Sequence, residues 1–360
     1  MKSAIVHDWL ISAVGGGEKV LQAMHQLFHS PIYTLVQNKQ NLQGTYFQDL
    51  PIHTSWIQKL PGAATKYKSY LPLFPLAIER FDLSAYDVIL SSSHCAAKGV
   101  IAAPNQVHIC YCHTPMRYAW DLMDEYLQDY GRVKGALARM CLSYLRKWDV
   151  RSSKRVDHFI ANSQYIAQRI EKCYGRSSTV IYPPVDVSFY NAVQRKDSYY
   201  VTASRLVPYK KIDLIVEAFS QMPGKKLVVI GDGPEWKKIK AKAASNIELL
   251  GIQSDAMLRE HLQRARAFVF AAVEDFGISP VEAMACGTPV IAYGKGGACE
   301  TVVGGQTGLF FEQQSVPSLI DAIQRFEALE WDVDRCRKRA EYFSPERFDR
   351  EFKQFVLGKL

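Results

Sequence analysis

Residues 271–285 read AAVEDFGISPVEAMA and continue as CGTPVI through residues 286–291. The apolar run at 267–270 predicts a buried strand just before this stretch, and residues 280–286 predict a helix. Glu274 therefore lies in a turn that leads from a strand into a helix. Such turns place polar groups at the carboxyl ends of parallel strands, where α/β proteins bind their ligands.

Three features of this turn and helix favour a phosphorylated ligand. Gly277 has no side chain, so the backbone can approach a ligand closely. Free N–H groups at the start of the helix suit an anion such as a diphosphate. Glu282 lies within the helix and can point back toward the crevice beside Glu274.

This stretch, through Gly287-Thr288-Pro289, resembles the paired-glutamate motif of family 4 glycosyltransferases. The resemblance implies an α/β fold of GT-B architecture, with two facing Rossmann-like domains, parallel sheets and a C-terminal helix that crosses back to the N-terminal domain. It also implies retaining chemistry and a donor that contacts Glu274, Phe276, Gly277, Ile278 and Glu282. The alternative is two solvated glutamates beside an ordinary helix, which the glycine and proline context disfavours.

Length and composition agree with a two-domain globular protein. The chain has 360 residues, of which 48% are hydrophobic and 22% charged. No apolar run approaches the roughly 18 residues of a membrane span. His7 and Asp8 interrupt any signal-peptide core, and the eight cysteines form no CxxC pair. We therefore expect reduced thiols and a cytoplasmic location.

Apolar runs alternate with helical segments along the chain, which predicts parallel sheets covered by helices on both faces. Pro183 and Pro184 interrupt this alternation and mark a connector. We expect an acceptor domain at residues 1–185, joined by a helix at 344–360, and a donor domain at 186–343. The expected strands lie at residues 4–7, 32–36, 88–91, 107–111, 158–161, 199–203, 227–230, 247–250, 267–270 and 290–292.

The segment SRLVPYKK at residues 204–211 follows the first strand of the second domain. Arg205 and Lys210 can reach over the crevice from this turn, and their charges would stabilise a departing diphosphate. They match the diphosphate-binding arginine and lysine of the family. The family often has glycine after that lysine, where this chain has Lys211, and we assign the contact to Lys210.

Each domain has a glycine turn after a predicted strand. In the first domain the turn follows the strand at residues 4–7, and in the second it follows the strand at residues 227–230. Gly16 and Gly17 open a helix, and they resemble the glycine-rich loop of the family that approaches the donor. Gly231 belongs to a GxG turn that the family places near the nucleotide. A dinucleotide fingerprint fails there because Trp236 occupies the third glycine position. Both turns could instead serve backbone geometry alone.

His113 ends a predicted strand and matches the family histidine that contacts the donor sugar. We expect it to donate or accept a hydrogen bond rather than to abstract a proton. Arg117, Tyr118 and Asp121 follow it closely and are candidate acceptor-binding residues. The catalytic set implied by the resemblance is His113, Glu274, Arg205 and Lys210.

No metal site is predicted. Asp332 and Asp334 have the spacing of a metal-binding DxD, but no strand precedes them, so Asp332 is expected to cap a helix. We expect catalysis without a metal or cofactor, with the nucleotide sugar as co-substrate.

Residues 132–155 predict a basic amphipathic helix that either docks on an anionic membrane surface or presents a solvated face. Asp149 is the only acid in this segment. No nucleic-acid motif accompanies the charge, which disfavours nucleic acid as a partner. Its basic residues are Arg132, Lys134, Arg139, Arg146, Lys147, Arg151, Lys154 and Arg155. Its apolar residues are Leu137, Met140, Cys141, Tyr144, Leu145 and Trp148.

The sequence thus predicts a glycosyltransferase that acts on a glycan or lipid-linked saccharide in cell-surface polysaccharide synthesis, in the cytoplasm or on the inner face of the membrane. Similarity to bacterial polysaccharide mannosyltransferases around residues 113–118 favours GDP-mannose as the donor. A nucleotide-sugar epimerase or hydrolase of GT-B fold, and a non-catalytic sugar-nucleotide-binding protein, are the alternatives.

Overall fold

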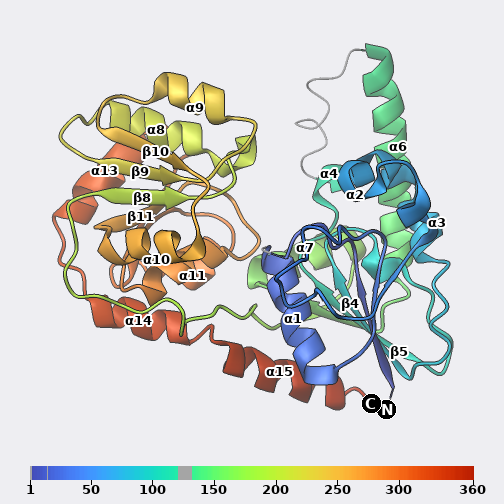
Figure 1. Ribbon diagram of the computed structural model, residues 1–360. Coiled ribbons are helices and arrows are strands. Elements are labelled where there is room, and N and C mark those ends of the chain that lie inside the picture. Colours follow the sequence, from blue (N-terminus) through green and yellow to red (C-terminus); the bar gives the residue numbers. More distant parts are fainter. Residues whose placement is uncertain (1, 14, 121–131) are drawn as a thin grey trace. The chain divides into compact units, whose positions relative to one another are not determined.

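A computed structural model of the chain describes residues 2–13, 15–120 and 132–360 (Figure 1). The chain divides into two compact units. Unit 1 comprises Met1–Pro184 and Phe348–Leu360, and unit 2 comprises Val185–Arg347. The sequence analysis placed these divisions at residues 185/186 and 343/344.

Unit 1 contains a seven-stranded sheet in the order β3-β2-β1-β4-β5-β6-β7, and every pairing in it is parallel. The direction of strand succession reverses between the neighbouring strands β1 and β4, as in Rossmann-like sheets. The strands are β1 (Ser3–His7), β2 (Ile32–Thr34), β3 (Ile52–Thr54), β4 (Val88–Ser93), β5 (Val107–Cys112), β6 (His158–Ala161) and β7 (Ser178–Val180).

Unit 2 contains a six-stranded parallel sheet in the order β10-β9-β8-β11-β12-β13. Here the succession reverses between the neighbouring strands β8 and β11. The strands are β8 (Tyr200–Ala203), β9 (Leu227–Ile230), β10 (Ile247–Gly251), β11 (Ala267–Phe270), β12 (Val290–Tyr293) and β13 (Gly308–Phe311). The predicted α/β class with two parallel Rossmann-like sheets is confirmed.

Helices and short 3-10 turns connect the strands. Unit 1 has α1 (Gly16–Phe28), α2 (Ala63–Lys66), α3 (Phe74–Ile78), α4 (Arg117–Trp120), α6 (Arg132–Ser153), α7 (Gln164–Tyr174) and most of α15 (Pro345–Leu357), with η1 (Trp56–Lys59), η2 (Tyr67–Leu73) and η3 (Ala97–Gly99). Unit 2 has η4 (Pro208–Lys210), α8 (Ile212–Ser220), α9 (Trp236–Lys242), α10 (Asp255–Arg264), α11 (Ile278–Ala285), α12 (Ala298–Thr301), α13 (Val316–Glu327) and α14 (Val333–Glu341).

The central strands are apolar on both faces because helices cover both faces of each sheet. In β1, Ala4 and Val6 belong to one core cluster, whereas Ile5 belongs to the cluster on the other side. Such double burial produces near-continuous apolar runs, and these runs made the central strands predictable. All the expected strands are present. The strands that the sequence analysis missed, β3, β7 and β13, lie at sheet edges, where fewer apolar side chains are needed.

The C-terminal helix α15 completes the core of unit 1, as the sequence predicted. Phe348, Phe352 and Val356 are fully buried in one cluster with residues of β1, β5 and α1. The Phe352 ring packs edge-on against Phe28 of α1, with 6.1 Å between ring centroids. Figure 1 shows α15 beside α1 in unit 1. Unit 1 is therefore built from two separate parts of the sequence.

Phe352→Ala is expected to lower the free energy of unfolding of unit 1 by about 3–5 kcal/mol, because it removes a fully buried aromatic ring. Leu357→Ala, on the same helix but 51% exposed, is the control and should change stability by less than about 0.5 kcal/mol. Denaturant unfolding, followed by hydrogen exchange in each unit, measures both. A loss of protection confined to unit 2 strands would contradict this role for α15.

Candidate functional site

Two strands at the centre of the unit 2 sheet, β8 and β11, are neighbours on either side of the reversal in strand order. The loops that leave their carboxyl ends diverge to opposite faces, and such a switch point forms a crevice in open α/β sheets. The loop after β8 carries Arg205 and Lys210, and the loop after β11 carries Glu274. The fold therefore brings together the residues predicted to hold a donor.

Lys210 and Glu274 form an ion pair across this crevice. Their side chains are only 16% and 20% exposed, so the pair is shielded from much of the solvent. Lys210 ends η4, and Glu274 precedes Gly277 at the start of α11. Although 64 residues separate them in the sequence, the fold brings the two charges into direct contact.

Arg205 is exposed in the loop between β8 and η4. The turn after β9 supports this loop: the Leu206 amide donates to the Asp232 carbonyl at 2.9 Å. Gly231 has a φ of +127°, and a Cβ on it would lie 1.9 Å from the Ser204 carbonyl oxygen. Glycine at 231 therefore lets the turn pack directly against the loop that presents Arg205. Whether Gly231 also contacts a donor stays a prediction.

Helix α11 begins at Ile278, behind Gly277, which adopts a φ of +89°. No side chain caps this end of the helix, so its first amides are not satisfied by a cap. Phe276 is buried and packs edge-on against Phe343, with 5.3 Å between ring centroids. The packed phenylalanine fixes the turn, and the strained backbone at Gly277 explains why glycine is required there.

Glu282 lies inside α11 and is only 6% exposed. Its carboxylate is hydrogen-bonded to the hydroxyl of Tyr190, and burial together with this carboxylate raises the pKa of Tyr190. Tyr190 precedes the first strand of unit 2 and belongs to no motif, so the sequence analysis did not single it out. The predicted contact of Glu282 with a ribose stays a prediction, and such a contact would compete with Tyr190.

Gly296 and Gly297 support the Glu274 turn and were missed in the sequence. A Cβ on Gly297 would lie 2.3 Å from the Phe276 Cα, and the Gly297 amide donates to the Glu274 carbonyl at 2.8 Å. Gly296 has a φ of +77°, and a Cβ on it would lie 2.6 Å from the Glu274 carbonyl oxygen. Their position in a glycine-rich turn between β12 and α12 repeats the strand–glycine–helix pattern, and this signal could have identified them.

Unit 1 gathers histidines at its own switch point, where β1, β4 and β5 are neighbours. The Nε2 atom of His113, just after β5, lies 2.8 Å from the Ser92 hydroxyl of β4. His7 ends β1, and its Nδ1 atom lies 3.0 Å from the same hydroxyl. A Cβ on Gly17 would lie 3.7 Å from His113 Nε2. The predicted glycine loop, which includes Gly16, and the predicted histidine are therefore adjacent.

Burial keeps these imidazoles neutral. Desolvation lowers the pKa of His113 to about 3, and the neighbouring His94 and His7 contribute to the shift. Desolvation likewise lowers the pKa of His7 to about 4. Near neutral pH, His113 is therefore neutral and carries one ring proton. Its expected hydrogen bond to a donor sugar stays a prediction.

Asp8 organises the loop after β4. Its two carboxylate oxygens accept the backbone amides of residues 94–97, at 2.5–2.9 Å. The Oδ2 atom of this fully buried carboxylate also lies 3.0 Å from His94 Nδ1. Burial opposes its ionisation, but His94, His7 and the amides outweigh burial and lower the pKa of Asp8. Asp8 thus fixes His94 beside His113, and nothing local in the sequence indicated this.

The candidate acceptor residues lie at the start of α4. Arg117 is the first residue of this helix and is partly exposed. The Tyr118 hydroxyl donates to the Cys95 thiol, so it points into the core. Asp121 lies outside the described residues. An acceptor-binding role for these residues stays a prediction.

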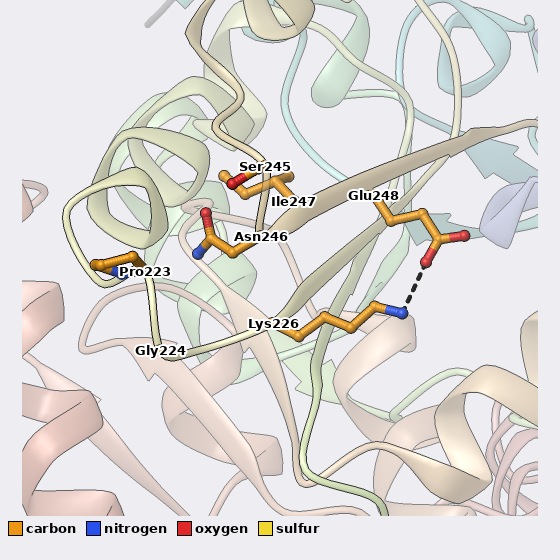
Figure 2. A pocket seen from close by; sticks show the side chains of 7 residues that line it. All are labelled: Pro223, Gly224, Lys226, Ser245, Asn246, Ile247 and Glu248. Atoms are coloured by element: carbon orange, nitrogen blue, oxygen red, sulfur yellow. Dashed lines mark ion pairs between the residues drawn. The ribbon is translucent and has the colours of Figure 1, made fainter.

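A separate hollow of about 470 Å³ lies at the amino ends of β9 and β10 (Figure 2). Asn246 donates there to the carbonyls of Phe219, Met222 and Lys225, and Lys226 pairs with Glu248 at 3.0 Å. The Asn246 hydrogen bonds hold the turn that precedes β9, and the ion pair joins the beginnings of β9 and β10. The hollow is at the opposite edge of the sheet from Arg205 and Glu274, so it is no part of the candidate site.

The predicted helix cap at Asp332 is confirmed. Its Oδ1 atom accepts the amides of Asp334 and Arg335 at 2.8 and 3.2 Å, at the start of α14. The aspartate pair thus serves a local structural purpose.

The basic helix α6 is anchored to unit 1 through its single acid. Buried Asp149 pairs with buried Lys98 and accepts hydrogen bonds from Trp120 and Tyr174, each at 2.9 Å. Leu145 and Trp148 are buried in the core. Two of the basic residues are also held internally: Arg146 donates to the Ala119 carbonyl, and Arg155 pairs with Glu79.

The opposite face of α6 is exposed, and it combines apolar and basic side chains. Leu137, Met140 and Tyr144 are 63%, 66% and 49% exposed. Arg139, Lys147, Arg151 and Lys154 are exposed as well. In Figure 1 the N-terminal half of α6 extends beyond the other elements of unit 1. Within the described ranges, no helix has the length and apolarity needed to span a membrane.

Two family models match the chain. The model described as Glycosyl transferases group 1 matches residues 188–343, and the one described as Glycosyltransferase Family 4 matches residues 32–189. Together they cover most of both units.

Curated relatives match part of the chain. An uncharacterized glycosyltransferase of Methanocaldococcus jannaschii is 32% identical over 173 residues, which are 46% of this chain and 48% of that protein. A GDP-mannose-dependent alpha-(1-6)-phosphatidylinositol monomannoside mannosyltransferase of Mycolicibacterium smegmatis is 33% identical over 144 residues, 34% of this chain and 37% of that protein. The match thus spans about half or less of the length of these relatives.

Solved structures share the whole fold. HepE of Anabaena, in complex with UDP and glucose, superposes with a TM-score of 0.71 at 18% identity over 100% of both chains. A sucrose-phosphate synthase of Thermosynechococcus elongatus gives a TM-score of 0.74 at 18% identity over 99% of both chains. At this level of identity the likeness shows the fold.

Two Rossmann-like parallel sheets, with a C-terminal helix packed on the first unit, define the GT-B class of α/β proteins. The chain belongs to the family 4 glycosyltransferases of this fold.

The departure from the family pattern at Lys211 has a measurable consequence. Lys211 precedes α8 with a φ of 55°, a left-handed conformation that glycine adopts without strain. Lys211→Gly is expected to raise the free energy of unfolding by up to about 1 kcal/mol, because relief of roughly 1–2 kcal/mol of strain exceeds the added entropy of the unfolded chain.

Lys240→Gly is the matched control, because Lys240 lies in helical backbone on exposed α9. This change should lower stability by about 1 kcal/mol. Denaturant unfolding compares the two variants. Equal losses in both would show that Lys211 is not strained.

Proposed function

We propose that this protein is a retaining glycosyltransferase that transfers a sugar from a nucleotide diphosphate donor to a hydroxyl group. The observation that carries the proposal is the Lys210–Glu274 pair at the switch point of unit 2, beside the uncapped start of α11. Cationic side chains and free amides bind diphosphates. A carboxylate beside them suits the hydroxyls of the attached sugar.

In this mechanism Arg205, Lys210 and the first amides of α11 hold the donor diphosphate. The glycosidic bond breaks through an oxocarbenium-like transition state, so negative charge grows on the leaving phosphate, where these groups stabilise it most. Glu274 binds sugar hydroxyls, and Glu282 binds the ribose. Lys210 exchanges its contact with Glu274 for the diphosphate, which frees the carboxylate for the sugar.

Retention of configuration follows a front-face route in the proposed mechanism, with the acceptor attacking from the side that the phosphate leaves. The departing phosphate takes the acceptor proton, so no protein nucleophile is needed. His113 contributes a hydrogen bond to the sugar, in keeping with its neutral imidazole. No metal or further cofactor takes part, so activity is expected to survive chelation with EDTA.

GDP-mannose is the proposed donor. The name of the Mycolicibacterium smegmatis relative, GDP-mannose-dependent mannosyltransferase, supports this choice, whereas the UDP bound to HepE makes a UDP-sugar the competing donor. A glycan or a lipid-linked saccharide in cell-surface polysaccharide synthesis is the proposed acceptor. A thermal-shift screen of GDP-, UDP- and ADP-sugars tests the donor, because a bound ligand raises the melting temperature.

Turnover separates the proposal from the alternatives. A transferase consumes the donor in step with an added lipid-linked saccharide and forms a product with the donor's anomeric configuration. An epimerase or hydrolase would consume the donor without any acceptor. A sugar-nucleotide-binding protein would show a thermal shift without turnover.

Arg205→Ala and Lys210→Ala are each expected to lower kcat/KM by roughly 2–4 kcal/mol of transition-state stabilisation, a factor on the order of 30 to 1,000. Lys211→Gly is the matched control, since it removes a neighbouring positive charge and retains the turn. Steady-state transfer kinetics measure all three. Near-normal turnover in both alanine variants would rule out the proposed diphosphate contacts.

We further propose that the exposed face of α6 docks on the anionic inner face of the membrane. Leu137, Met140 and Tyr144 would enter the headgroup region, and the surrounding lysines and arginines would contact anionic lipids. A protein docked in this way would meet a lipid-linked acceptor at the surface. The combination of exposed apolar and basic side chains on one helix face supports this site.

Arg139, Lys147 and Arg151, all replaced by Ser, should weaken binding to anionic vesicles by about 3 kcal/mol, at about 1 kcal/mol per charge. The effect should fade at high salt. The matched control replaces Lys237, Lys240 and Lys338, exposed lysines of unit 2, and makes the same change in net charge. Co-sedimentation with phosphatidylglycerol and with phosphatidylcholine vesicles measures binding. Equal binding to both vesicle types would show that this face is a solvated surface and does not recognise anionic lipids.

A further inference from the structure

One hydroxyl group lies between the imidazoles of buried His7 and partly buried His113 at the switch point of unit 1. Ser92 Oγ is 2.8 Å from His113 Nε2 and 3.0 Å from His7 Nδ1. Ser92 and His7 are fully buried, so water does not replace either contact. The three side chains form a linear hydrogen-bonded chain that crosses from β1 through β4 to the end of β5.

A serine hydroxyl donates one hydrogen bond and can accept two. Within the described part of the chain the Ser92 hydroxyl has no acceptor other than the two imidazoles, so its buried proton goes to one of them, which leaves two consistent arrangements. In the first, His7 Nδ1–H donates to Ser92, and Ser92 donates to His113 Nε2. In the second, His113 Nε2–H donates to Ser92, and Ser92 donates to His7 Nδ1. Both rings are neutral in either case, because burial lowers the pKa of each imidazole well below its usual range.

The far nitrogen of His7 distinguishes the two arrangements. His7 Nε2 is buried and has no hydrogen-bond partner within the described part of the chain. The second arrangement would place an N–H group there without an acceptor, and buried orphan N–H groups are rarer in proteins than under-satisfied acceptors. The first arrangement leaves only an unused lone pair on that nitrogen, so it is favoured.

The first arrangement defines what His113 offers to a ligand. With Nε2 accepting from Ser92, the ring proton of His113 resides on Nδ1. The side-chain amide of Asn162 donates to the His113 carbonyl at 3.0 Å, and the His113 backbone amide donates to the Ser93 carbonyl at 2.8 Å. The backbone of His113 is therefore held in place as well. His113 Nδ1 makes no hydrogen bond with the residues that the structure describes.

We propose that Ser92 and His7 are positioning residues that hold His113 in the Nδ1–H tautomer, so that His113 donates a hydrogen bond to an oxygen of the bound sugar. The proposal rests on the proposed function for the identity of that oxygen. The tautomer itself is a property of the ligand-free protein, so it is tested separately.

Nitrogen-15 NMR of the full chain without ligand reports the tautomer, with the His113 signals assigned by their loss in His113→Gln. The expected spectrum shows a protonated Nδ1 and an unprotonated Nε2 for His113. A protonated Nε2 would overturn the proposal.

Ser92→Thr and Ser92→Val form a matched pair, because both add the same bulk to the strand and only threonine retains the hydroxyl. The threonine variant should keep the Nδ1–H tautomer, whereas the valine variant should shift the proton toward Nε2. The same tautomer in both variants would overturn the role of Ser92, and comparison of their melting temperatures shows whether both are folded.

His7→Asn and His7→Leu test the other end of the chain of hydrogen bonds. The asparagine amide nitrogen takes the place of Nδ1 and can still donate to Ser92, whereas leucine cannot. Only the leucine variant should alter the His113 tautomer and lower kcat/KM, by about tenfold for one lost hydrogen bond. If the tautomer follows these predictions but no transfer occurs with any donor, the proposed function fails and the tautomer assignment stands. If transfer occurs but the tautomer does not respond to these substitutions, the tautomer assignment fails and the proposed function stands.

Discussion

The parallel direction of every strand is the constraint on which both candidate regions depend. In a parallel sheet all the carboxyl ends lie along one edge, and the reversal of strand order at β1 and at β8 opens a crevice at that edge. The polar and charged side chains of the two candidate regions lie at or just after the carboxyl ends of these strands and their neighbours. They are His7 and His113 in unit 1, and Lys210 and Glu274 in unit 2. The sheet thus gathers residues that are distant in sequence without any dedicated structural element.

Glycines and buried charges then set the geometry at these edges. Gly231 and Gly297 allow one loop to rest directly on the backbone of another, at distances that any side chain would block. Asp8 gathers four backbone amides, so the loop after β4 cannot move independently of β1. These contacts preorganise the loops before a ligand arrives. The ion pair of Lys210 with Glu274 differs, because in the proposed mechanism a ligand exchanges partners with it.

The central strands and the residues of the switch point in unit 2 were predictable because each has a local signature. Double burial gave the strands apolar runs, the strand–glycine–helix pattern located Glu274, and the basic turn after the first strand of the second domain located Arg205. Edge strands β3, β7 and β13 lacked such runs. Tyr190, Asp8 and Ser92 were not predictable, because their importance arises from contacts between distant segments. The same limit applied to α6, where periodicity could not separate buried Leu145 from exposed Met140.

The discontinuous composition of unit 1 affects how the protein is made. Its core includes Phe348 and Phe352, which the ribosome adds only after all of unit 2, residues 185–347. At about 5–20 residues per second, synthesis of unit 2 alone takes roughly ten to thirty seconds, and throughout this time the apolar surface of α1 and β5 lacks its cover. Unit 2, a continuous segment, has no such delay. During synthesis unit 1 therefore begins before unit 2 but completes its core after it.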